Sequence, residues 1–255
     1  MRMRGSPDRR CPLPVRLELD SVCRILDGLR VFNRPCLDIG FRHPQACARL
    51  RAAGGSWTSL AFDEPARARI ATDWNGDVQL VGPRRMLPFE DKQFDVVVLG
   101  LGSLTGDPDA DSALIRECHR VLLTPGYLIL TVEFDKPFGL ASLLGGRTAT
   151  GGRYSEPALF DLLKTGFDWL GSRHFSRFWL QLVRQRANRN RPDDEHAQLL
   201  DVLYWIARKL DVTNLLTRGY LVTVHGRRKG WRPRKTPALA DGRSLAEAVL
   251  SGRGQ

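Results

Sequence analysis

The sequence contains no run of 18 or more apolar residues, so we expect no helix that crosses a bilayer. The first 14 residues are basic and lack the apolar stretch of a secretory signal, so we expect no export. The five cysteines are scattered without a C-x-x-C pair, which predicts neither a disulfide framework nor a zinc site. The five histidines are also dispersed, so no metal site is expected. Together these absences favour a cytoplasmic protein.

Positive charge, by contrast, is abundant: the formal net charge is +11 and the isoelectric point is near 10.0. A protein this basic attracts polyanions, so nucleic acid, anionic lipid or an acidic substrate are candidate partners. The alternative is that the charge has no binding role and reflects a solvated tail or the arginine usage of a GC-rich genome. Two clusters carry much of the excess, namely Arg184, Arg186, Arg189 and Arg191, and Arg227, Arg228, Lys229, Arg232, Arg234 and Lys235.

The length of 255 residues and the hydrophobic fraction of 42% are enough for one sizeable core. We expect a disordered basic tail over residues 1–14 and one domain over 15–230. Its core should span 35–134, with a helical insertion at about 176–217 before the last strand. Residues 231–255 should form a flexible basic tail.

Short apolar runs alternate with helical patterns along the chain. Strands are predicted at 36–40, 57–62, 78–81, 94–101, 127–134, 167–175 and 220–225. Helices are predicted after a cap at Asp20 or Ser21, at 43–53, at 66–72, after a cap at Asp109 or Asp111, after Ser155, and at 194–210. This alternation predicts an α/β fold: a Rossmann-like, doubly wound, mostly parallel seven-stranded sheet with helices on both faces.

In such sheets a ligand sits beyond the carboxyl ends of the strands, where the strand order reverses. The first strand ends at Asp38-Ile39-Gly40, and a helix is predicted to begin at about His43. Gly40 lets the backbone turn and come close to a ligand. The loop after the first strand is therefore the first place to expect a ligand.

Two further motifs carry a specific resemblance. Residues 87–98 read LPFEDKQFDVVV, and residues 116–130 read RECHRVLLTPGYLIL. Both are similar to stretches of class I, S-adenosylmethionine-dependent methyltransferases of the type 11 subgroup, L-P-F-x-D-x-x-F-D-V-V and R-E-x-x-R-V-L-K-P-G-G-x-L-x-L. With residues 37–40, the resemblance covers about residues 35–134. It implies the fold named above and S-adenosylmethionine as cofactor.

The resemblance also implies where that cofactor would lie. The family's glycine-rich loop wraps the methionine part, an acidic residue after the second strand holds the ribose hydroxyls, the residues before L-P-F flank the adenine, and the end of the fourth strand faces the acceptor. A carboxylate suits the ribose because it accepts two hydrogen bonds from a diol. Carried over to this chain, the cofactor-binding positions are Asp38, Gly40, Phe41, His43, Asp63, Glu64, Arg85, Met86, Gly100 and Leu101.

The chain departs from the family pattern at two positions. The loop should read D-x-G-x-G-x-G, but Phe41-Arg42-His43-Pro44 follow Gly40, so any left-handed backbone at the second glycine position would be strained. Pro83 stands where a polar residue commonly precedes the adenine segment. These departures favour a second hypothesis, a methyltransferase-like binding or scaffold protein that has lost methyl transfer.

No residue is assigned as catalytic, because methyl transfer from a sulfonium needs mainly proximity and orientation. His119 is expected mid-helix and facing solvent; His43 could contact a ligand or simply begin a helix. We expect His174 and His225 to be structural. The aromatics between residues 167 and 208 are expected in the core, with stacking on nucleobases as the alternative. The leading hypothesis is methyl transfer to an unidentified acceptor, expected to be a small molecule. The scaffold protein is the second hypothesis, and an RNA-acting enzyme is the third.

Overall fold

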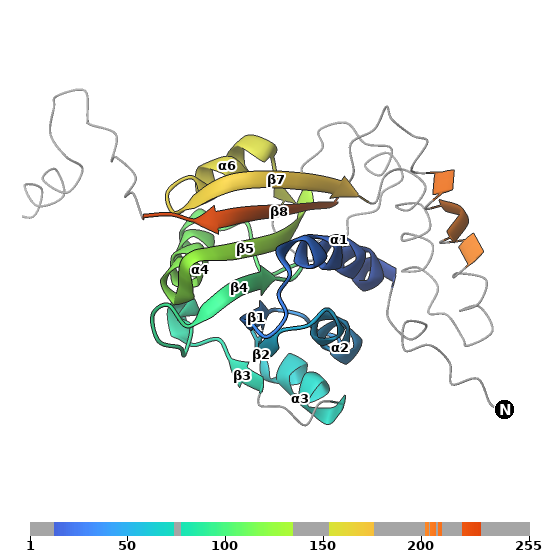
Figure 1. The fold of residues 1–255 in the computed structure, drawn as a ribbon, viewed down its shortest axis with the longest axis horizontal. Coiled ribbons are helices and arrows are strands. Elements are labelled where there is room, and N and C mark those ends of the chain that lie inside the picture. Colours follow the sequence, from blue (N-terminus) through green and yellow to red (C-terminus); the bar gives the residue numbers. More distant parts are fainter. Residues whose placement is uncertain are drawn as a thin grey trace, which may run out of the picture.

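The computed structural model describes residues 13–73, 78–134, 153–175 and 221–230, with short helical pieces at 202–203, 205–207 and 209–210. Its centre is one twisted sheet in the order β3-β2-β1-β4-β5-β8-β7 (Figure 1). The bounds are β1 Pro35–Ile39, β2 Ser56–Ala61, β3 Val78–Leu80, β4 Phe94–Leu99, β5 Leu122–Phe134, β7 Phe167–Phe175 and β8 Leu221–Arg228. The two-residue β6, Arg153–Tyr154, pairs with β5 outside this path.

Strands β1 to β5 run parallel to one another, and β8 is antiparallel to both of its neighbours. The predicted mostly parallel, doubly wound α/β sheet is therefore confirmed. The strand order reverses between β1 and β4, which is where ligands bind in open α/β sheets.

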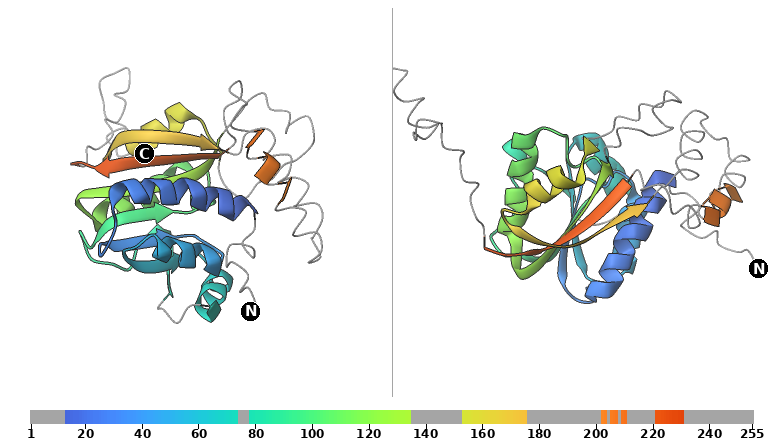
Figure 2. Two further views of the ribbon diagram at one scale, coloured as in Figure 1. Left: turned by 45° about the vertical axis from the view of Figure 1, so that its right-hand side comes forward. Right: turned by 90° about the horizontal axis from the view of Figure 1, so that it is seen from above.

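Helices cover both faces of the sheet (Figure 2). One face carries α1 Leu13–Leu29, α2 Pro44–Ala52 and α3 Glu64–Asp73, and the other carries α4 Pro108–Val121 and α6 Glu156–Leu163. Side chains that alternate along β1 divide between two cores: Leu37 and Ile39 pack with α4 and α6, while Cys36 packs with α1 and α2. No helix in the described part of the chain is long and apolar enough to cross a membrane.

Several element boundaries differ from the sequence expectation. Helix α1 begins at Leu13 rather than after a cap at Asp20 or Ser21. Helix α4 is capped by Asp107, whose side chain accepts from Asp109 N, so Asp109 and Asp111 lie inside its first turn instead of capping it. Strand β5 begins at 122 rather than 127.

The predicted tails and the helical insertion fall mostly outside the described residues: 1–12, 231–255, and all of 176–217 except the short pieces at 202–210. The basic cluster Arg184–Arg191 lies outside them too. Domain boundaries therefore remain predictions. The described residues of the predicted helix 194–210 are helical.

The LPF and REXXR motifs meet in one cluster of hydrogen bonds, which we name the Arg120 cluster. The Arg120 guanidinium donates to the carbonyls of Leu87 (3.0 Å) and Phe89 (2.8 Å) and to the carboxylates of Asp91 (2.9 Å) and Glu117 (2.9 Å). Glu117 also accepts from Leu87 N at 3.0 Å. These bonds lower the pKa of Glu117, the Arg120 hydrogen bond most. The two motifs that carry the resemblance are therefore joined by hydrogen bonds that fix the β3–β4 loop on α4.

Candidate functional site

Gly40 lies at the carboxyl end of β1, beside the point where the strand order reverses. Its φ is +82°, a left-handed conformation that favours glycine. A Cβ placed here would overlap the Ser103 hydroxyl and come within 2.8 Å of the Phe62 ring. Ser103 donates to the Ile39 carbonyl at 3.1 Å, which holds the loop after β4 against the loop after β1. Gly40 is therefore required by the close approach of three loops.

Phe41, the next residue, is buried and packs against Gly100, where a Cβ would stand 3.3 Å from its ring. Arg42, at the second glycine position, does not have the left-handed backbone that would strain it: the left-handed non-glycine residues in the described part of the chain are Arg30, Asn33, Arg84, Arg85 and Lys92. The loop has taken another path, with Phe41 turned inward and Arg42 outward.

Asp63 follows β2 and forms the N-cap of α3, where its Oδ1 accepts from Ala66 N at 2.7 Å. Its other oxygen, Oδ2, lies 3.5 Å from Arg42 Nη2, and both side chains are well exposed, 63% for Arg42 and 43% for Asp63. The near alternative, Glu64, pairs instead with Arg67 on the surface of α3, at 2.7 Å. Of the two predicted ribose carboxylates, Asp63 is the one fixed beside the Gly40 loop.

Asp38 is placed differently, under α2 and completely buried. Ser59 donates to its Oδ2 at 2.8 Å, the Cys47 thiol lies 3.7 Å from its Oδ1, and Arg51 forms an ion pair at 3.6 Å. Burial raises the pKa of Asp38 to about 6, although Arg51 and the hydrogen bond from Ser59 oppose the rise. The side chain thus joins β1, β2 and α2 beneath the loop, and both oxygens already have protein partners.

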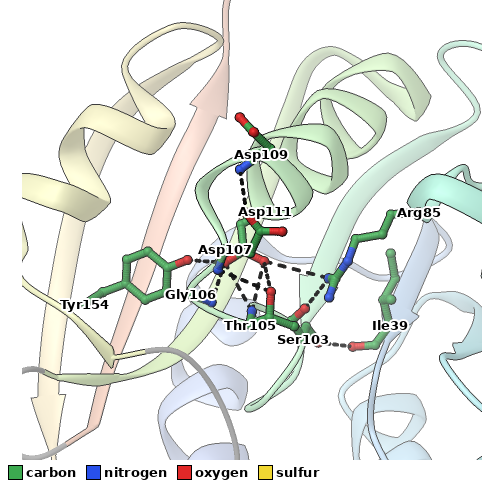
Figure 3. Close-up of polar contacts among 9 residues, drawn as sticks. All are labelled: Ile39, Arg85, Ser103, Thr105, Gly106, Asp107, Asp109, Asp111 and Tyr154. Atoms are coloured by element: carbon green, nitrogen blue, oxygen red, sulfur yellow. Dashed lines mark hydrogen bonds and ion pairs between the residues drawn. The ribbon is translucent and has the colours of Figure 1, made fainter.

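Arg85 and Met86 lie in the β3–β4 loop, at the end of a 3-10 helix over Pro83–Arg85, and their side chains differ in exposure. The Arg85 guanidinium donates to the Ser103 carbonyl at 2.5 Å and lies 5.2 Å from the Phe62 ring centroid (Figure 3 shows its reach toward Ser103). Met86 is 58% exposed. Arg84 and Arg85 are both left-handed, with φ of +53° and +63°. Backbone strain of this kind costs about 1–3 kcal/mol per residue and often marks functional regions.

Asp111 is a fully buried carboxylate at the centre of Figure 3. It accepts from the backbone of Thr105 (2.9 Å) and Gly106 (2.7 Å) and from the Tyr154 hydroxyl, and it lies 3.9 Å from Arg85 Nη1. Burial, followed by this hydrogen bond, raises the pKa of Tyr154. Asp111 therefore ties the β4–α4 loop to Arg85 on one side and to β6 on the other.

Gly100 and Leu101 form the start of the loop after β4. The Leu101 N–H donates to Glu18 Oε1 at 2.6 Å, and Glu18 is a buried side chain of α1. Gly100 N donates to the Ile39 carbonyl at 2.9 Å. Helix α1 therefore packs on α2 and also holds the loop that lies beside Gly40.

Two histidines, His43 and His119, differ in the contacts that surround them. His43 is the N-cap residue of α2 without a side-chain cap bond, and burial, then Arg69, lowers its pKa. His119 is not solvent-facing as expected: it is buried, its Nε2 lies 2.6 Å from the Lys229 carbonyl, and its ring meets Phe167 edge-on. The described residues hold no group of His, Cys, Asp and Glu that could bind a metal.

The described part of the C-terminal basic cluster lies at the opposite end of the sheet from Gly40. Arg227 pairs in register with Tyr127, near the amino end of the parallel run, whereas the carboxyl end of β5 pairs with Leu221. Asp168 offsets the charge, with Lys229 at 3.1 Å and Arg227 at 3.8 Å. These cations do not share an edge with the candidate site.

Residues 37–130 match the family described as "Methyltransferase domain". The matched segment contains the two motifs above, and together with the sheet order it supports the resemblance to the class I, S-adenosylmethionine-dependent methyltransferases of the type 11 subgroup. A demethylmenaquinone methyltransferase of Staphylococcus epidermidis is 45% identical over 62 residues, which are 24% of this chain and 24% of that protein. The chain thus aligns with about a quarter of the length of the curated relatives it matches.

Solved structures share the fold at low identity. A geranyl diphosphate C-methyltransferase of Streptomyces coelicolor A3(2), crystallised with S-adenosyl-L-homocysteine, has a TM-score of 0.57 at 10% identity, over 82% of this chain and 76% of that one. The cyclase SpnF has a TM-score of 0.54 at 21% identity, over 82% of this chain and 80% of that one. At these identities the likeness concerns the fold alone.

Sequence reasoning missed two members of the site. Phe62 lies against Gly40, and the Tyr154 hydroxyl donates to Asp111. The position of Phe62, between the end of β2 and the α3 cap, was an available signal. Tyr154 gave none, because its contact joins residues 43 positions apart.

Proposed function

We propose that this chain binds S-adenosylmethionine across the ends of β1, β2 and β4 and transfers its methyl group to a small-molecule acceptor. The observation that carries the proposal is that Gly40 and Asp63 both lie at the switch point of the sheet. Gly40 has no side chain to block the approach of a ligand to the loop backbone. The helix cap on Oδ1 leaves the other Asp63 oxygen at the same edge of the sheet.

The residues fit the cofactor under one condition. A carboxylate oriented by a helix cap can accept hydrogen bonds from ribose hydroxyls, and the cofactor would supply an activated methyl group. Asp63 Oδ2 is occupied at 3.5 Å by an exposed guanidinium, which must move for the ribose to bind. Asp38 would support the loop from below rather than touch the ligand, since its oxygens are engaged with Ser59, Arg51 and Cys47.

Transfer itself needs an in-line approach of acceptor and methyl group, and orientation can supply most of the acceleration. In the proposal, the loop after β4 forms the wall facing the acceptor. Glu18 holds that loop at Leu101, and Asp111 holds it at Thr105 and Gly106. The name of the demethylmenaquinone methyltransferase above supports a small molecule as the class of acceptor.

A second candidate is a methyltransferase-like binding protein without transfer. It is favoured by the side chains at the site: Phe62 and Ser103 lie against Gly40, and Arg42 sits on Asp63. The RNA-acting hypothesis stays a prediction: Arg227 and Lys229 lie at the other edge of the sheet, but Arg184–Arg191 and residues 231–255 fall outside the described part of the chain.

Calorimetric titration with S-adenosylhomocysteine separates the first two candidates. Asp63→Ser keeps a good helix cap but removes the carboxylate, so binding should weaken about tenfold, the loss of one charge-assisted hydrogen bond pair. Ser155→Ala removes the cap of α6, so it controls for a general loss of stability, and it should bind normally. Absence of binding to the wild type at millimolar ligand would remove the proposed function and leave the binding-protein hypothesis.

A further inference from the structure

The residue that replaces the second glycine of the family loop does more than fill space. Arg42 reaches from the β1–α2 loop to Asp63 on the β2–α3 loop, with Nη2 at 3.5 Å from Oδ2. Because Oδ1 is engaged by Ala66 N, Oδ2 is the oxygen left for any ligand. Arg42 therefore forms an ion pair with Asp63 Oδ2, the atom that the proposed function needs for the ribose.

Another arginine–aspartate pair in the chain is built more tightly. Arg49 donates to Asp20 at 2.5 Å, and their side chains are 30% and 21% exposed. At 3.5 Å, the Arg42 contact exceeds the usual N–H···O range of about 2.7–3.2 Å. An exposed, loose pair contributes about 0–1 kcal/mol, so a ligand can displace it.

We propose that Arg42 competes with the cofactor for Asp63, so that this one residue sets the cofactor affinity of the site. The inference rests on the proposed function, because it takes Asp63 as the ribose carboxylate. In the free protein the guanidinium occupies Oδ2; in the complex it swings into solvent. The energy of the ion pair is subtracted from the binding energy of the cofactor.

Competition of this kind predicts that added salt strengthens ligand binding instead of weakening it. Salt screens exposed charges, so raising ionic strength weakens the Arg42–Asp63 pair. A ribose diol and a zwitterionic ligand without net charge are affected much less. Binding of S-adenosylhomocysteine to the wild type should therefore tighten as salt rises from about 0.05 M to about 0.5 M.

The test is titration with S-adenosylhomocysteine of the wild type, Arg42→Ala, Arg42→Lys and Arg67→Ala. Arg42→Ala should bind about two- to fivefold more tightly and lose the salt effect, the range that an exposed ion pair supports. Arg42→Lys keeps the charge and should stay near the wild type. Arg67→Ala removes the neighbouring Arg67–Glu64 pair, which does not involve Asp63, and should change nothing.

A double-variant cycle completes the experiment. In an Asp63→Ser background, Arg42→Ala should bring no gain, because the competitor has lost its target. Equal or weaker binding by Arg42→Ala, or the same gain with and without Asp63, would overturn the inference while leaving the proposed function intact. Failure of every variant to bind would instead remove the proposed function, and the inference with it.

Discussion

The loops that follow β3 and β1 keep their shape in different ways. The β3–β4 loop matches the family pattern, and Arg120 and Glu117 hold it with a dense set of bonds to two carbonyls and a second carboxylate. The β1–α2 loop departs from the pattern, and Arg42, which replaces the second glycine, forms one long, exposed ion pair with Asp63. The comparison teaches that the motifs which fix the fold are intact, whereas the loop proposed to face the cofactor departs from the family pattern.

The largest effect on the free energy of unfolding should come from Asp38, which lies buried beneath the β1–α2 loop. The folded-state pKa of Asp38, about 6, lies above its unfolded value of 3.8, so the folded protein binds the extra proton between pH 4 and 6. The contribution of Asp38 to the free energy of unfolding therefore falls as pH rises through this window, by about 3 kcal/mol in total. The free energy of unfolding of the wild type, measured with denaturant, should fall relative to that of Asp38→Asn as the pH rises from 4 to 7. A pH-independent difference would contradict the role given to burial.

Next in size is the Arg120 cluster. Arg120→Met leaves Glu117 and two carbonyls without their donor, and we expect the free energy of unfolding to fall by about 2 kcal/mol. Lys164→Met removes an exposed pair within one helix and should cost less than about 0.5 kcal/mol. Equal costs for the two variants, measured by urea titration, would mean that the β3–β4 loop is held no more firmly than an ordinary surface.

Gly40→Ala probes the opposite loop. The new Cβ would overlap Ser103, meet the Phe62 ring and take a φ of +82°, so we expect a loss of about 1–2 kcal/mol. Gly230→Ala is the matched control, since nothing lies within 4 Å of its Cβ position. Thermal unfolding of both variants measures the contrast; a neutral Gly40→Ala would show that the three loops are not in contact.

The smallest effect is expected at the link from β6 to the β4–α4 loop. Tyr154→Phe removes one of several donors to Asp111 and should cost about 1 kcal/mol, a fall of about 2–4 °C in the unfolding midpoint. Tyr127→Phe removes a hydroxyl that bonds to nothing in the described part of the chain, and should leave the midpoint unchanged. A larger loss at Tyr127 would reverse this ranking.

The fold was open to sequence reasoning because its determinants are local. The run Val96–Leu99 is buried on both faces of the sheet, as a parallel central strand requires, and Ser155 caps α6 as predicted. The cap of α4 was assigned wrongly, although Asp107 before Pro108 is an ordinary helix start. Its neighbour Asp111 became a buried acceptor instead, since Tyr154 and the Thr105–Gly106 backbone supply donors there.

The site was less open to sequence reasoning because its contacts join loops. Sequence placed Gly40 and Asp63 at the ends of two strands, but gave no sign that Arg42 would reach Asp63. It expected strain only if the backbone at Arg42 were left-handed, and the backbone there is not left-handed. Side-chain positions across loops depend on packing that a single chain's pattern does not contain.

Amide hydrogen exchange with and without S-adenosylhomocysteine tests the central claim most directly, because it reports on both loops in one experiment. The account predicts ligand-dependent protection of residues 38–43 and 60–66, with the Arg120 cluster at 87–92 unchanged. Protection confined to other segments, or no change anywhere at saturating ligand, would contradict a cofactor site at Gly40 and Asp63.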